Sequence, residues 1–158
     1  MAVKGYATLE LVEAAGGVTL SERQRTEFRT LLAAAEGVID RLTERSFVAD
    51  GTSAAYVTRY FDGDGSACIV IDDLLTLNEL TVDDIVVASA DYYLRPLNET
   101  PKTLIELRYT SASNDTRNVD VEGIWGYSTT PPEAISLATA LLIAQMYSVP
   151  PWLRSQSV

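Results

Sequence analysis

The chain has 158 residues, of which 47% are hydrophobic, and a formal net charge of −10 with no histidine. A chain of this length buries roughly 68 to 70% of the surface that its unfolded form exposes, which is enough for one globular domain. The lack of histidine excludes histidine-dependent catalytic triads and histidine metal sites. No run approaches the roughly 18 apolar residues of a membrane-spanning helix, so we expect a soluble protein that does not contact membranes.

Acidic residues are concentrated in the middle of the chain. Residues 50–99 hold ten acidic and two basic side chains, and so carry −8 of the total charge. Nucleic-acid binding depends on Lys and Arg that displace counterions from phosphates, and the sequence contains no basic run. We therefore expect that DNA can pass close to the protein without specific binding.

The first predicted helix covers about residues 8–15. Thr8 precedes it and has the side chain of an N-terminal cap, while the pair Gly16 and Gly17 offers the left-handed conformation that ends a helix. The pattern of apolar residues between these signals has helical spacing. The sequence therefore predicts a short N-terminal helix.

A long amphipathic helix is predicted over about 21–45. Ser21 and Gln24 have the spacing of a capping box, and apolar residues then recur at steps of three and four. The stripe expected to be buried contains Phe28, Leu31, Leu32, Ala35, Val38, Ile39 and Leu42. The residues expected to face water are Arg23, Glu27, Glu36, Asp40 and Glu44.

A period of two begins near residue 54 and predicts a β-rich insert over about 54–125. The run Asp62-Gly63-Asp64-Gly65 indicates a hairpin turn, with residues 67–71 as the returning strand. Cys68 lies in this apolar run and is expected to be a small buried residue. Further short strands are expected at 77–82, 85–88, 92–94, 104–109 and 119–125.

The last helix is predicted over about 132–147, because Thr130 and two prolines supply a start signal. Its small residues are expected to let a neighbouring helix, the one beginning at Ser21, approach closely. These small residues are Ala134, Ala138, Ala140 and Ala144.

Together these elements predict an α+β fold of a single domain, 1–158. It consists of a small helical bundle, made of the short N-terminal helix and the two long helices, with the β-rich insert between the long helices. Residues 148–158 form a C-terminal tail.

The run Asp62–Ser66, together with Asp73, resembles a calcium loop because acidic residues occupy its first, third and twelfth positions. Ala67 stands where such a loop requires glycine, and the flanking segments are predicted strands, so a hairpin is favoured. We predict no metal site and no cofactor. A soluble calcium- or ligand-binding module that uses the Asp62 hairpin is the alternative function.

Carboxylates are the remaining candidates for catalysis. The pairs Asp72-Asp73 and Asp83-Asp84 lie beside predicted turns, where aspartate commonly supports backbone hydrogen bonds. A solvated turn is therefore favoured over an active site, and we predict that the protein is not an enzyme.

Two groups of side chains are candidates for interaction. Tyr60, Phe61, Trp125 and Tyr127 are expected to be packing or inter-subunit aromatics. Trp152, Leu153 and Arg154 lie in a tail that is too short to build its own core, and an aromatic anchor on such a segment is typical of docking. The alternative for the tail is that it folds back on its own domain.

In their order and spacing, six segments of the chain resemble head–tail connector (adaptor) proteins of tailed bacteriophages, and the resemblance covers nearly the whole chain. The segments are Tyr6–Glu10, Ile39–Phe47, Tyr60–Gly65, Tyr92–Asn98, Val119–Tyr127 and Pro131–Ile135.

The resemblance implies a structural virion protein at the head–tail interface, assembled in the bacterial host cytoplasm. It would form a homo-oligomeric ring of twelve copies beneath the portal protein, join the capsid to a stopper or tail-completion protein, and let DNA pass. Trp152, Leu153 and Arg154 would then form a portal-docking tail. Edge strands of the β-rich insert are candidates for pairing between neighbouring copies.

Overall fold

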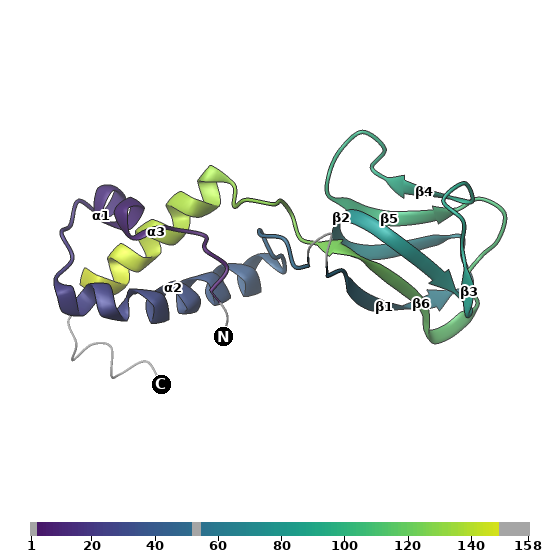
Figure 1. Cartoon of the computed structure of the whole chain (residues 1–158), viewed down its shortest axis with the longest axis horizontal. Coiled ribbons are helices and arrows are strands. Elements are labelled where there is room, and N and C mark those ends of the chain that lie inside the picture. Colours follow the sequence, from purple (N-terminus) through teal and green to yellow (C-terminus); the bar gives the residue numbers. More distant parts are fainter. Residues whose placement is uncertain (1–2, 52–54, 149–158) are drawn as a thin grey trace. The chain divides into compact units, whose positions relative to one another are not determined.

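The computed structural model describes residues 3–51 and 55–148. The chain divides into two compact units, which are Met1–Phe47 with Pro131–Val158, and Val48–Thr130. The first, called here the helical unit, holds three helices, and the second, the sheet unit, holds a six-stranded antiparallel sheet (Figure 1).

The helical unit contains α1 (Leu9–Gly16), α2 (Glu22–Thr43) and α3 (Glu133–Ser148). The predicted caps are confirmed. The Thr8 side chain accepts a hydrogen bond from the Leu11 amide, Gly17 ends α1 at a φ of 60°, and Ser21 and Gln24 form the capping box of α2. None of these helices is long and apolar enough to cross a membrane, within the part of the chain that the structure describes.

Helix α3 packs against both α1 and α2 (Figure 1). Ala140 and Ala144 are buried, as expected of small residues at a helix contact. The contact of α3 with α1 is more extensive than that with α2, and it is close, because a Cβ atom added at Gly16 would lie 2.6 Å from the Ala144 Cβ. The buried core of this unit is Ala7, Val12, Leu20, Leu32, Ala35, Ala140, Ile143 and Ala144.

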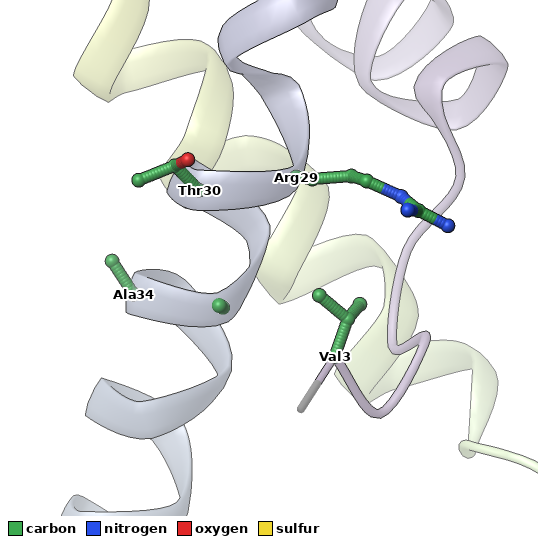
Figure 2. Close-up of a pocket in the computed structure, with 5 residues that line it drawn as sticks. Val3, Arg29, Thr30 and Ala34 are labelled. Carbon is green, nitrogen blue, oxygen red and sulfur yellow. The ribbon is translucent and has the colours of Figure 1, made fainter. Parts of the chain in front are cut away.

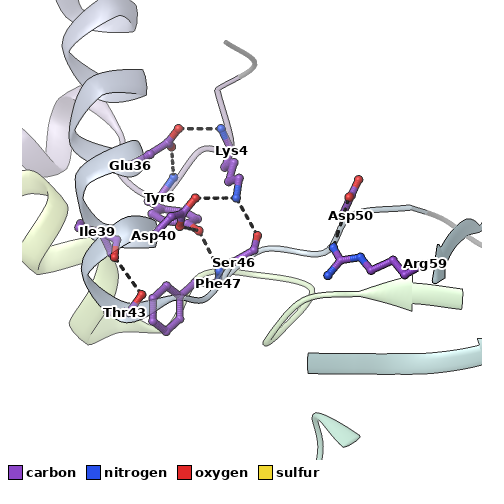
Figure 3. Close-up of polar contacts among 10 residues, drawn as sticks. All are labelled: Lys4, Tyr6, Glu36, Ile39, Asp40, Thr43, Ser46, Phe47, Asp50 and Arg59. Atoms are coloured by element: carbon purple, nitrogen blue, oxygen red, sulfur yellow. Dashed lines mark hydrogen bonds and ion pairs between the residues drawn. The ribbon is translucent and has the colours of Figure 1, made fainter. Parts of the chain in front are cut away.

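The prediction that Glu36 faces water is wrong, because the residue is only 2% exposed. Its carboxylate accepts hydrogen bonds from the Lys4 amide at 2.8 Å and from the Tyr6 amide at 2.8 Å (Figure 3). A buried carboxylate requires such donors, because burial removes the water that would otherwise solvate it. Glu36 thereby ties the N-terminal segment to the middle of α2.

Tyr6 makes a second link between the same two segments. Its hydroxyl donates to Asp40 Oδ1 at 2.5 Å and accepts from the Phe47 amide at 2.8 Å (Figure 3). The Lys4 ammonium group also pairs with Asp40, at 2.6 Å. Burial and the hydrogen bond to the Asp40 carboxylate raise the pKa of Tyr6 to about 12, because both favour the protonated hydroxyl.

The sheet unit has the strand order β1-β6-β2-β5-β4, with β3 paired to the end of β2. Strand β6 is therefore flanked by β1 and β2, and all pairs are antiparallel. The strands are β1 (Val57–Asp64), β2 (Cys68–Val82), β3 (Ile85–Val86), β4 (Tyr92–Arg95), β5 (Lys102–Leu107) and β6 (Asn114–Trp125).

The predicted hairpin between the strand before Asp62 and residues 67–71 is wrong. Strand β1 pairs with β6 and runs through Asp62 and Gly63 to Asp64. A Cβ atom at Gly63 would lie 2.1 Å from the Ser113 carbonyl oxygen, so glycine is required here by a close approach of backbone rather than by a turn.

Strand β2 is a single strand of 15 residues where two shorter strands were predicted. Asp72 and Asp73 lie within it rather than beside a turn, and the pairing register of β2 shifts in this region. Cys68 is exposed, which contradicts the expectation of a buried thiol. The reason is the alternation of the strand, which turns Ile69 and Ile71 inward and Cys68 outward.

The predicted fold class, a small helical bundle with a β-rich insert, is also wrong. The structure has three helices and a six-stranded antiparallel sheet, and the sheet has its own core of eleven buried residues against eight in the helical unit. Long continuous strands are the physical reason, since they let residues 48–130 bury apolar side chains among themselves.

We predict that Glu36→Ala lowers the free energy of unfolding by about 2 to 4 kcal/mol, because it leaves two amides without their acceptor. Urea denaturation measures this effect. Glu27→Ala is the matched control, since Glu27 is an exposed carboxylate on the same helix and should change stability by less than about 0.5 kcal/mol. Equal effects of the two substitutions would contradict a stabilising role for Glu36.

The raised pKa of Tyr6 predicts a loss of stability in strong base. Unfolded tyrosine titrates near pH 10, so the contribution of Tyr6 is fully present below pH 10 and is lost as the pH rises towards 12, by up to about 2 kcal/mol. Urea unfolding at pH 9 and pH 11.5 measures the loss. The stability of Tyr6→Phe should fall less steeply over this pH range than that of the native protein. Identical slopes for the two proteins would contradict the assignment of the loss to Tyr6.

Candidate interaction surfaces

Two of the predicted aromatic residues lie in the core of the sheet unit. Trp125, at the end of β6, is fully buried, and its indole Nε1 donates to the Val57 carbonyl at 2.8 Å. The Phe61 ring packs against it with centroids 5.7 Å apart. The Arg59 guanidinium lies 4.7 Å above the indole and is paired with Asp72 at 2.8 Å, and it also lies 3.6 Å from Asp50 (Figure 3).

The other two aromatic residues are less buried. Tyr60 is 48% exposed on the edge strand β1, with the Arg117 guanidinium 3.9 Å from its ring centroid, and Tyr127 is half-buried. The four residues thus contribute to the core and to an exposed strand rather than to one site. The predicted docking residues Trp152, Leu153 and Arg154 lie outside the described residues.

Asp62 and Asp64, two carboxylates of the segment that resembles a calcium loop, accept hydrogen bonds from the protein itself. Asp62 Oδ1 accepts from the Arg117 amide at 2.7 Å, and Asp64 Oδ1 accepts from the Ser66 amide at 2.9 Å. Hydrogen bonds from the Ser66 side chain and amide lower the pKa of Asp64. Among residues 3–51 and 55–148 no group of three or more His, Cys, Asp or Glu side chains could hold a metal ion.

A cluster of exposed apolar side chains lies at the end of the sheet unit where β2 turns into β3. Ile85 is 69% exposed, Val86 61% and Tyr109 74%. All three line one groove of about 420 Å³, together with Asp83 and Asp91 among others. We call this region, with the exposed Asp84, the tip surface. Neighbouring exposed apolar residues of this kind mark interaction sites in water-soluble proteins.

The tip surface is held in place by its turn. Asp83 and Asp84 both have positive φ, 50° and 63°, as required for a two-residue hairpin loop of this hand. The Asp83 carboxylate accepts from the Asn118 side chain at 2.6 Å and from the Ser113 amide at 3.0 Å. These hydrogen bonds, from Asn118 first and then from Ser113, lower the pKa of Asp83.

A second concave surface belongs to the helical unit. It has a volume of about 720 Å³ and is called here the α2 groove. Short side chains of α2 are among its lining residues, and Figure 2 shows Arg29 extending from α2 above Val3. Its lining residues are Val3, Arg29, Thr30, Ala33 and Ala34. Lys4 and Tyr6, held by Glu36, follow Val3 directly and so fix its place beside α2.

Arg29 differs from the other arginines near the start of α2. Arg23 pairs with Glu27 at 3.1 Å, and Arg25 pairs with Glu13 at 2.6 Å. Arg29 makes no ion pair with any residue that the structure describes, and it is exposed. The α2 groove therefore combines apolar lining residues with a cation that has no carboxylate partner in the described part of its own chain.

The outer face of α3 is also apolar. Leu137 and Leu141 are each 47% exposed, and Ala134 and Ala138 lie on the same face at helical spacing. These alanines were predicted to contact another helix, whereas the structure leaves them exposed. The charged side chain on this face is Glu133, in the first turn of the helix.

The two units differ in charge. The sheet unit holds fourteen acidic against five basic residues, a net charge of −9, and the helical unit eight against seven, a net charge of −1.

Neither the tip surface nor the α2 groove was predicted from the sequence. The available signal was the acidic pair Asp83-Asp84 followed directly by three β-branched apolar residues, which is unusual for a solvated hairpin end.

Comparison with known proteins shows a shared fold. No family model matches the sequence, and no curated protein matches it. A solved structure described as "Neck of empty GTA particle computed with C6 symmetry" contains a chain that is 18% identical, with a TM-score of 0.66. The match covers 94% of the present chain and 82% of that chain, so the two have the same fold over nearly their whole length.

Proposed function

We propose that the protein is a structural component of a virion, a head–tail connector of a bacteriophage or phage-like particle. The observation that carries the proposal is the likeness of fold, over 94% of the chain, to a chain in the neck of a GTA particle. The order of sequence segments that resembles phage connectors supports it independently. The proposal places the protein at the head–tail interface, after assembly in the host cytoplasm, with no catalytic role.

In this proposal the protein forms a ring of twelve copies between the portal protein and a stopper or tail-completion protein. The related neck was computed with sixfold symmetry, with which rings of six or twelve copies agree. Ring contacts join different surfaces of neighbouring copies. The tip surface and the α2 groove are two different exposed surfaces of one copy.

The charge of the protein suits a passage for DNA. Twelve copies at −10 each carry about −120, most of it on the sheet units, which hold −9 of each copy. Phosphates are repelled by such a field within about 8 Å at physiological salt, which opposes adhesion of DNA without the need for any specific contact. DNA would therefore pass the ring without binding.

The first prediction concerns assembly with the portal protein encoded beside this protein. Multi-angle light scattering of the mixture should show a complex that contains about twelve copies of the chain for each portal ring. The protein alone is the reference, since a ring of this kind can require the portal as a template. A chain that stays monomeric and separate from the portal at all concentrations would remove the connector function.

The second prediction concerns the tail. Trp152→Ala should weaken portal binding at least about 30-fold, the effect of losing a buried aromatic anchor, with an unchanged circular dichroism spectrum. Truncation after Ser148 should abolish binding. Ser155→Ala is the matched control, because it alters the same segment without removing an aromatic or charged group. Portal binding that survives the truncation would exclude the tail as the docking segment while leaving the rest of the proposal open to the first test.

A further inference from the structure

We propose that the tip surface of one copy docks in the α2 groove of a neighbouring copy, so that the occupant of each surface is a second copy of this chain. The inference rests on the proposed ring, and it adds which surfaces form the contact between copies. It depends on the apolar character and the charge of the two surfaces. Each of these is a property of one unit alone.

The tip surface is held rigid by its turn. Three exposed apolar side chains lie beside a turn that is fixed by the hydrogen bonds of Asp83 to Ser113 and Asn118. Because the turn is ordered before any partner arrives, docking it costs little conformational entropy. Ile85 and Val86 stand at the end of a two-residue loop, where little of their own chain can cover them.

The α2 groove offers matching chemistry. Ala33 and Ala34 line it, and their short side chains leave room for the larger apolar groups of the tip surface. Its rim carries Arg29, which has no ion-pair partner among the described residues. The tip surface carries the exposed carboxylate of Asp84 next to Ile85. One contact would therefore bury apolar groups against apolar groups and pair the cation with a carboxylate.

Electrostatics favours this pairing over a contact between two sheet units. Two sheet units each carry a net charge of −9 and repel one another. The repulsion between a sheet unit and a helical unit is weaker, because the helical unit has a net charge of only −1. Pairing through edge strands, which the sequence suggested, would bring two acidic units together. The edge strand β4 is also short, at four residues. Joining the sheet unit of one copy to the helical unit of the next gives the heterologous contact that a ring requires.

Site-directed cross-linking in the assembled ring tests the contact. All variants carry Cys68→Ser, because the native thiol is exposed. Ala34→Cys with Ile85→Cys, treated with a short bis-maleimide, should give a ladder of covalent multimers that extends to the full ring. Ala34→Cys with Val70→Cys is the matched control, since Val70 is 75% exposed on the same unit but outside the tip surface. It should give no ladder.

Exchange of the two charges is the second test. Arg29→Glu and Asp84→Arg should each reduce assembly at least about 10-fold, and the double variant should recover to within about 3-fold of the native protein. Single variants without effect, or a double variant without recovery, overturn the inference. Circular dichroism confirms that each variant is folded.

The outcomes separate this inference from the function on which it rests. Rings that form on the portal but give no more cross-linking at residues 34 and 85 than at residues 34 and 70 overturn the docking contact and leave the connector function standing. The absence of any ring, with native protein and portal together, overturns both.

Discussion

The sheet unit depends on the position of β6 between β1 and β2. Strands β1 and β2 follow one another in sequence but have few contacts with each other. Each pairs with β6, which lies much further along the chain, with Val57 opposite Gly123 and Leu80 opposite Val121. The inward face of β6 supplies Val119, Val121 and Trp125, all fully buried. Without β6, strand β1 would lose its ladder partner and the second half of β2 would lose most of its pairing.

The pairing of β6 with β2 also requires glycine at one position. A Cβ atom at Gly123 would lie 2.2 Å from the Thr76 carbonyl oxygen, at a place where the register between β2 and β6 shifts. Glycine permits this close approach of two backbones. Strand β2 thereby pairs with β5 at its start and with β6 at its end, which makes one sheet out of strands that would otherwise form two small ones.

The helical unit is stabilised in a different way. Its core is small, at eight buried residues, and the N-terminal segment is tied to α2 through the buried carboxylate of Glu36 and the hydroxyl of Tyr6. The same hydrogen bonds hold Val3 beside α2 and so complete the α2 groove. A group that stabilises the unit therefore also shapes its surface, while the sheet unit carries nearly all of the net charge. The proposed contact between copies uses this difference in charge.

The sequence by itself determined the features that depend on near neighbours along the chain. The caps at Thr8 and Ser21 and the left-handed Gly17 were predicted correctly, because each involves residues within three or four positions. The acidic character of residues 50–99 was likewise plain from composition. Of the aromatic residues predicted to pack or to join subunits, Tyr60 lies exposed on a strand and Trp125 is buried in the core, and neither the tip surface nor the α2 groove was predicted.

Only the tertiary structure decided which strands pair and which side chains remain exposed. A short run such as Asp62-Gly63-Asp64-Gly65 has the local chemistry of a turn, and only the approach of Ser113, about 50 residues away, shows that Gly63 lies inside a strand. Glu36 looks solvated until the amides of Lys4 and Tyr6 are brought to it. The exposure of Ile85 and the groove beside Arg29 were decided in the same way, because burial is set by the partners that long-range packing supplies or withholds.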